Sequence, residues 1–162
     1  MIRITKITDY GITVLSALAS QPEAKPRNAR EIAAATHLPA PTVSKILGVC
    51  TRANLLTSLR GANGGYTLAR SPESISVADI IVAFEGPLAL TECLSHEAPD
   101  CDVESVCPTR SNWHRINAAI RKSLEEIPLS EMAIPQRGWQ ARMGAALVSV
   151  EGLAPGGTGV TQ

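Results

Sequence analysis

Aromatic residues are scarce in this chain of 162 residues, where they make up only 3% of the sequence. The hydrophobic fraction is 44%, so a core must be built mostly from Leu, Ile, Val and Ala, which favours helices. No apolar run approaches the roughly 20 residues that a membrane span needs. No obvious secretory leader is present either, so we expect a cytoplasmic protein whose cysteines stay reduced.

Signatures of an enzyme are also missing. No nucleophile–base pair is readable, and the glycine-rich stretch at residues 60–65 lacks the lysine and the following helix of a phosphate-binding loop. We therefore expect no catalysis and no small-molecule substrate. The net charge is zero, but residues 1–70 carry a balance of +6 and residues 71–162 a balance of −6. The basic first part favours an anionic partner such as double-stranded DNA.

Three helices are predicted before residue 54. Thr8 and Asp9 offer a cap for the first, and Asn28 with Glu31 forms a capping box for a second helix at residues 29–36. A third helix starts near Pro41, because proline is tolerated in a first turn. Its expected apolar face is Val43, Ile46, Leu47 and Cys50. The second and third helices make a helix-turn-helix.

A β-hairpin is expected next, with strands at residues 55–59 and 66–69 around a glycine-rich turn. A helix at residues 76–85, capped by Ser76, follows. The predicted fold is mainly α with a small β-hairpin wing: a winged helix-turn-helix domain over residues 1–86, followed by a long dimerisation helix.

DNA contacts are expected from polar side chains on these elements, although an ordinary solvated role is the alternative for each. The first turn of the third helix would enter the major groove, and the wing tip would reach phosphates or the minor groove. The candidates are Arg30, Thr42, Ser44, Lys45, Arg52, Arg60 and Asn63.

Residues 87–108 form a cysteine-rich loop that holds Cys93, Cys101 and Cys107 in the spacing C-x7-C-x5-C. Thiolates so close in sequence can converge on one soft metal centre, and an iron–sulfur cluster is the favoured interpretation. Zinc is disfavoured because no C-x2-C pair is present. The loop could also be a thiol–disulfide switch, or simply carry three unliganded thiols. Cys50 is expected to be a small buried hydrophobe.

Residues 109–132 are predicted to form a dimerisation helix, whose regular apolar pattern runs over about residues 109–127. An apolar stripe at steps of three and four needs a partner, and a second copy of the chain is the economical one. Packing on its own domain is the alternative. The stripe is Trp113, Ile116, Ile120, Leu124 and Ile127. We expect the tail, residues 133–162, to be mobile, at least after Gly152.

Several segments resemble the iron–sulfur-dependent winged-helix repressors of the IscR, NsrR and RirA type. They are RITKITDYGITVLSALAS, REIAAATHLPAPTVSKIL, RGANGGYTLAR and VADIIVAFEGPLALTEC, and the resemblance covers about residues 1–132. The TDYG opening and WHRINAAI are most similar to the branch that regulates the Suf cluster-assembly genes.

The resemblance implies a homodimer that binds a palindromic operator and holds a [2Fe-2S] or [4Fe-4S] cluster on Cys93, Cys101 and Cys107. One branch of the family takes its fourth ligand from a histidine three residues after the last cysteine, where this chain has Arg110. Another uses the acidic residue of TDYG from the opposite subunit, which is Asp9 here and is our first choice. His114, His96 or a small thiol are the alternatives, and Asp9 could instead be a plain first-turn helix carboxylate.

These observations predict a transcriptional repressor that senses iron–sulfur status, iron supply or oxidative and nitrosative stress and controls Suf genes. A thiol-redox or zinc-responsive regulator on the same fold is one alternative. An iron–sulfur scaffold or electron carrier is another, although its cysteines would more often follow compact ferredoxin spacings.

Overall fold

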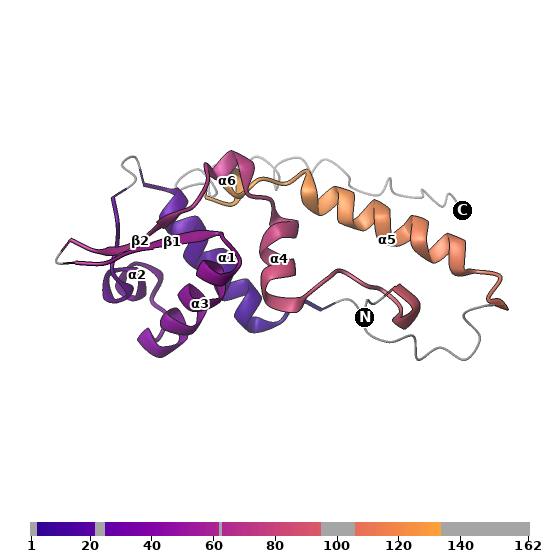
Figure 1. The fold of residues 1–162 in the computed structure, drawn as a ribbon, viewed down its shortest axis with the longest axis horizontal. Helices are drawn as coiled ribbons and strands as arrows, with labels where there is room; N and C mark the ends of the chain where they lie inside the picture. The colour runs from indigo at the N-terminus through magenta and orange to yellow at the C-terminus, as the bar shows by residue number, and fades with distance from the viewer. Residues whose placement is uncertain (1–2, 22–24, 62, 95–105, 134–162) are drawn as a thin grey trace, which may run out of the picture.

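The structure is a computed structural model that describes residues 3–21, 25–61, 63–94 and 106–133. Its elements, in chain order, are α1 (Lys6–Ala19), α2 (Ala29–Thr36), α3 (Ala40–Arg52), β1 (Leu56–Leu59), β2 (Gly65–Leu68), η1 (Pro72–Ser74), α4 (Val77–Glu85), η2 (Glu92–Leu94), α5 (Arg110–Glu125) and α6 (Leu129–Met132). Helices α1 to α4 and the hairpin gather at one end, and α5 extends away from them (Figure 1). None of the helices described is long and apolar enough to cross a membrane.

The helix-turn-helix begins at a complete capping box. Asn28 Oδ1 accepts from the backbone amides of Arg30 and Glu31, each at 3.0 Å, and Glu31 Oε2 accepts from the Asn28 amide at 3.0 Å. Helix α2 ends at Thr36, and the C-cap residue His37, whose φ of 55° lies in the left-handed region, turns the chain toward α3. Pro41 sits in the first turn of α3, where a missing N–H costs little. The predicted helix-turn-helix is confirmed.

The wing is an antiparallel hairpin in which Leu56 pairs with Leu68 and Leu59 with Gly65. Both strands lie within one residue of the predicted bounds. The hairpin is extended by Arg27, whose amide donates to the Tyr66 carbonyl at 3.1 Å and whose carbonyl accepts from the Tyr66 amide at 2.8 Å. A Cβ on Gly65 would lie 2.6 Å from the Arg27 carbonyl oxygen, so this close approach needs glycine.

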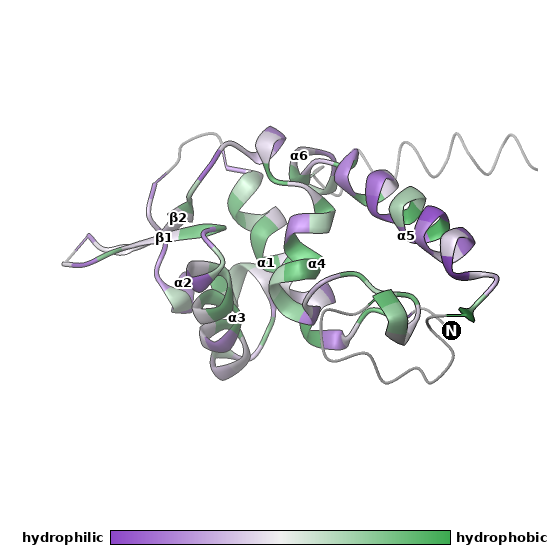
Figure 2. Ribbon diagram, turned by 45° about the vertical axis from the view of Figure 1, so that its right-hand side comes forward, coloured by the Kyte–Doolittle hydropathy of each residue, from purple (hydrophilic) through white to green (hydrophobic). Residues whose placement is uncertain are grey.

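The core is aliphatic, as the scarcity of aromatic residues requires. Helices α1 and α4 run through its centre and carry mostly hydrophobic residues (Figure 2). Each fully buried Leu or Ile contributes roughly 1.5–3 kcal/mol of transfer free energy. The large side chains with at most 2% exposure are Val14, Leu15, Ile32, Val43, Ile46, Leu47, Leu55, Leu56, Ile75, Ile80 and Leu129.

The predicted start of the first helix is wrong. Helix α1 begins at Lys6 with Thr5 at the N-cap position, so Thr8 and Asp9 lie inside the helix. Thr8 is completely buried, and its hydroxyl bonds to Glu85 of α4 instead of capping its own helix. The Thr8 side chain, which the local pattern assigned to a helix cap, instead makes a tertiary hydrogen bond.

The predicted helix at residues 109–127 is too long. Helix α5 ends at Glu125, and Ile127 leaves the helix because a residue before proline, here Pro128, avoids the helical region. The chain then turns back: the Val77 amide donates to the Ile127 carbonyl at 2.9 Å and the Leu129 amide to the Ile75 carbonyl at 2.7 Å. Helix α6, absent from the sequence predictions, packs on α1 and η1.

The predicted division into domains stays a prediction. The tail that the sequence predicts to be mobile lies outside the described residues, except for Ala133, whose carbonyl accepts from the Ser20 hydroxyl at 2.8 Å.

Candidate nucleic-acid interface and thiol site

Helix α3 presents its polar side outward because its apolar side is completely buried. Val43, Ile46 and Leu47 are inaccessible to solvent, whereas Ser44 and Lys45 are exposed. Exposed hydroxyl and ammonium groups in the first two turns of a helix are suited to base edges and phosphates. The other candidates on α3 are Thr42, which is partly buried, and Arg52, which is exposed in the last turn.

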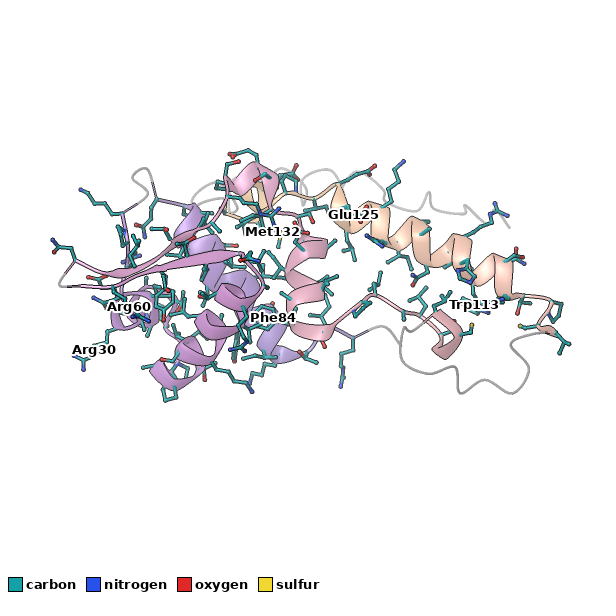
Figure 3. The ribbon with its side chains drawn as sticks, in the orientation of Figure 1. Arg30, Arg60, Phe84, Trp113, Glu125 and Met132 are labelled. Atoms are coloured by element: carbon teal, nitrogen blue, oxygen red, sulfur yellow. The ribbon has the colours of Figure 1, made fainter. Side chains whose placement is uncertain are left out.

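The wing and α2 supply the flanking cations. Arg30 is exposed in the first turn of α2, and Arg60 and Asn63 are exposed in the hairpin turn. Arg30 and Arg60 lie at the same end of the molecule (Figure 3). The seven predicted DNA-contacting residues lie on α2, α3 and the hairpin turn, and their grouping into one interface stays a prediction.

Two of the three loop cysteines are described, and both are free thiols. Cys93 lies on η2, partly buried, with its Sγ 3.2 Å from Thr91 Oγ1. Cys107 lies three residues before α5, with its Sγ 3.4 Å from Thr109 Oγ1. Hydrogen bonding from the Thr109 side chain, and then from the Thr109 backbone, lowers the pKa of Cys107 and favours its thiolate. Cys101 and His96 lie outside the described residues.

These thiols fit a thiolate-ligated metal group. Neither is used in a disulfide or in the core, and Cys107 is biased toward the form that binds metals. Thiolate sulfur selects soft centres such as iron–sulfur clusters, zinc or Cu(I). Cys50 is different: it is inaccessible to solvent, and burial raises its pKa to about 12, so the prediction of a buried apolar role is confirmed.

Asp9 and His114 are not gathered with these cysteines within one chain. Both are exposed, on the first turn of α1 and the second turn of α5 respectively. Among the residues that the structure describes, no three His, Cys, Asp or Glu side chains come close enough to hold a metal ion. The identity of a fourth ligand stays a prediction.

Sequence reasoning missed Glu85, which ties α1 to the segment leading into the loop. Its Oε1 accepts from the Thr5 amide at 2.9 Å, from the Thr5 hydroxyl at 2.6 Å and from the Thr8 hydroxyl. These bonds lower the pKa of Glu85 and fix the turn that carries Asp9 against the end of α4. No local pattern could reveal them, because the partners are 77 to 80 residues apart.

The apolar stripe of α5 is divided between two environments. Ile120 and Leu124 are partly buried toward α4, whereas Trp113 and Ile116 are 38% and 44% exposed. Trp113 lies near the far end of α5, away from the winged-helix core (Figure 3). The outer half of the stripe thus remains open to a partner.

Comparison with known proteins identifies this architecture. The profile of the Rrf2 family, described as iron-dependent transcriptional regulators, matches residues 4–134. The transcriptional regulator NsrR of Halalkalibacterium halodurans is 28% identical over 139 residues, which cover 86% of this chain and 95% of that protein.

Solved structures agree with this match. CymR, the global cysteine regulator of B. subtilis, superposes with a TM-score of 0.64 at 31% identity, covering 82% of this chain and 97% of that one. IscR of T. potens superposes with a TM-score of 0.60 at 30% identity, covering 81% and 85%. These relatives are regulators and not enzymes, and the predicted winged-helix fold is confirmed. The chain belongs to the Rrf2 family of iron-dependent transcriptional regulators.

Proposed function

We propose that this regulator is a homodimeric repressor that binds a palindromic operator in the cytoplasm and senses iron–sulfur status through its loop thiols. Its output would be control of Suf cluster-assembly genes in response to iron supply or to oxidative and nitrosative stress. The observation that supports this most directly is the pair of free thiols, Cys93 and Cys107. They flank residues 95–105 and lie between the DNA-reading domain and α5.

The ligand set follows from these thiols. Cys93, Cys101 and Cys107 would hold the cluster, and Thr109 favours the thiolate of Cys107. A bound cluster would supply a crosslink among thiolates that is lost on exposure to oxidants. Asp9 of the partner subunit would complete the set, as the resemblance to the Suf-regulating branch implies, and Asp9 is exposed in the first turn of α1.

Dimerisation would use the outer half of the α5 stripe. Trp113 and Ile116 expose apolar surface that a second α5 could cover. A two-fold arrangement would set the separation of the two α3 helices, which fixes the spacing of the half-sites in the operator. Helix α5 begins just after Cys107, and the segment after its C-terminal end is bonded to Ile75 and Val77. A shift of α5 at the thiols would therefore reach the winged-helix domain.

On DNA, Thr42, Ser44 and Lys45 of α3 would contact base edges and phosphates in the major groove. Arg60 and Asn63 of the wing would reach phosphates or the minor groove, where arginine is favoured electrostatically. Arg30 and Arg52 would contact the backbone on either side of this site.

A thiol-redox regulator on the same fold is the second candidate. It is supported by the similarity to CymR, named for cysteine regulation, and by the lowered pKa of Cys107. A zinc-responsive regulator stays a third possibility, and a scaffold or electron carrier would have no use for the recognition helix and wing.

The deciding experiment is anaerobic purification followed by an absorption spectrum and by counting of iron, sulfide and zinc. The proposed function predicts a brown protein with a visible band and stoichiometric iron and sulfide. DNA duplexes selected from a random library should then be palindromic, with an affinity that depends on salt and on the cluster. A colourless protein with one zinc, or DNA affinity indifferent to iron and oxygen, overturns the proposal.

Three variants sharpen that experiment. Replacing Cys93, Cys101 and Cys107 together with Ala should abolish the visible band and the response, whereas Cys50→Ala should keep both because Cys50 is buried in the core. Asp9→Ala tests the fourth ligand: it should lower cluster loading. Unchanged loading and DNA affinity in Asp9→Ala would exclude Asp9.

A further inference from the structure

The side-chain amide of Asn117, in the middle of α5, makes two hydrogen bonds to the backbone of residues 88–90, an arrangement that we name the Asn117 bracket. Its Nδ2 donates to the Leu88 carbonyl at 3.0 Å, and its Oδ1 accepts from the Leu90 amide at 3.2 Å. Both bonds are partly buried. The bracketed stretch lies between the end of α4 at Glu85 and the η2 turn that carries Cys93.

The positions of both described thiols are tied to one helix, α5. Cys107 is three residues before Arg110, the first residue of α5, so the start of the helix places it. Cys93 follows Leu90 by three residues and lies on η2, which packs against α5. One end of the loop is therefore fixed by chain connectivity and the other by the Asn117 side chain.

We propose that Asn117 is a positioning residue that sets where Cys93 lies relative to Cys107. Its effect on cluster retention rests on the proposed function, but the placement of Cys93 does not. Segment 87–91 has no helix or strand to hold it, and the Asn117 bonds attach two of its backbone groups to a rigid element. A site held within a narrow range of geometry needs such support around its ligands.

The chemistry of the bracket requires asparagine. A side-chain amide donates and accepts in one plane, which matches a carbonyl and an amide two residues apart. Aspartate keeps the acceptor for Leu90 and loses the donor to Leu88. Alanine removes both the donor and the acceptor, so the partly buried Leu88 carbonyl and Leu90 amide lose their hydrogen-bond partner.

The first test uses the apo protein and the alkylation rate of each cysteine, measured by peptide mass spectrometry. Asn117→Ala should raise the rate at Cys93 by roughly tenfold, the order expected for two lost hydrogen bonds, and leave Cys107 unchanged. Cys50 is the internal control, because only unfolding of the core exposes it. Asn112→Ala, an amide removed from an exposed position of the same helix, should behave as the wild type.

Asn117→Asp should give a rate at Cys93 between those of the wild type and Asn117→Ala, which keeps the test decisive if the alanine variant folds poorly. A parallel rise at Cys50 means general destabilisation and overturns a positioning role. An unchanged rate at Cys93 in both Asn117 variants overturns it as well.

The second test measures release of iron from the anaerobically purified protein to a chelator. Asn117→Ala should release iron several-fold faster than the wild type and Asn112→Ala. Equal rates overturn the link to cluster retention. A wild-type protein that holds no cluster overturns the proposed function, and the alkylation rates then still decide whether Asn117 positions Cys93.

Discussion

The hydroxyl of Thr8, buried in α1, donates a hydrogen bond to the carboxylate of Glu85 at the end of α4. The amide and hydroxyl of Thr5 donate to the same carboxylate oxygen. This cluster of Thr5, Thr8 and Glu85, which we name the clasp, joins two segments that both matter to the proposed sensor. One carries Asp9, and the other leads through residues 86–91 to Cys93.

The clasp predicts a defined dependence of stability on pH. Hydrogen bonds from the Thr5 and Thr8 side chains lower the pKa of Glu85 below its ordinary value of 4.5, so folding favours the charged form. This contribution is fully present above the ordinary pKa and is lost as the pH falls through the lower pKa of the folded state. Glu85→Gln should therefore be less stable than the wild type at pH 7, and the difference should shrink as the pH falls below the ordinary pKa of 4.5.

Urea unfolding of both proteins across that range measures the effect. Glu73→Gln, an exposed glutamate on η1, is the matched control and should show a smaller difference at pH 7. A gap between wild type and Glu85→Gln that stays constant down to pH 3 would contradict the charged role of Glu85.

Gly11 of α1 packs tightly against Phe84 of α4. A Cβ at this position would lie 2.5 Å from the Phe84 ring, which cannot be accommodated without movement. Gly11→Ala should therefore destabilise the protein by roughly 1–3 kcal/mol through overpacking, although alanine is the better helix former by about 1 kcal/mol. Thermal or urea unfolding gives the value, and Phe84→Leu in the same chain should restore part of it.

Gly48 in α3 is the matched control for Gly11. A Cβ at Gly48 would meet only Arg52 Nη1, at 3.5 Å, which is ordinary contact. Gly48→Ala should stabilise the protein by up to about 1 kcal/mol. Equal effects of the two substitutions would show that the approach of Phe84 to Gly11 does not limit packing.

The elements of the winged helix could be predicted from sequence because their signals are local. The capping boxes at Asn28 and Ser76 and the glycine-rich turn before Gly65 each lie within a few residues, and each formed as expected. The resemblance to iron–sulfur regulators also led to the Rrf2 family, which the comparisons confirm.

What the sequence could not reveal depends on residues far apart in the chain. Glu85 and Asn117 both act on backbone or hydroxyl groups more than 25 residues away, and neither belongs to a local motif. The end of α5 is different, because its signal is local: a proline at 128 disfavours a helical conformation at Ile127. The prediction instead followed the regular spacing of apolar residues and extended the helix to residue 127. The thiol site combines both situations. The spacing of its cysteines could be read from the sequence, whereas the hydrogen bonds of Glu85 and Asn117 around it could not.

Arg60 in the wing should contribute to DNA affinity without reading sequence. Arg60→Ala should weaken binding to all duplexes by a similar factor and reduce the slope of log affinity against log salt by about 1. Fluorescence anisotropy with a selected duplex and a scrambled one at several salt concentrations measures both quantities. Arg115→Ala, which removes an exposed cation from α5, is the control and should change neither. A loss confined to the selected duplex would instead assign Arg60 to base readout.

Substitution of Leu129 tests whether the segment after α5 is part of the winged-helix domain. Its side chain is inaccessible to solvent, and its amide is bonded to Ile75, between the wing and α4. Leu129→Ala should lower the free energy of unfolding by roughly 2–5 kcal/mol, because it removes a buried side chain and leaves a cavity. Met132→Ala, on the same short helix and 44% exposed, should cost much less.

The two variants should also differ in DNA binding. Since Leu129 anchors the C-terminal end of α5 to the core, Leu129→Ala should weaken operator affinity even at a temperature where it remains folded by circular dichroism. Met132→Ala should bind as the wild type does. A folded Leu129→Ala protein with unchanged affinity would mean that the position of α5 is set by its other contacts with α4, and that the turn at Pro128 serves stability alone.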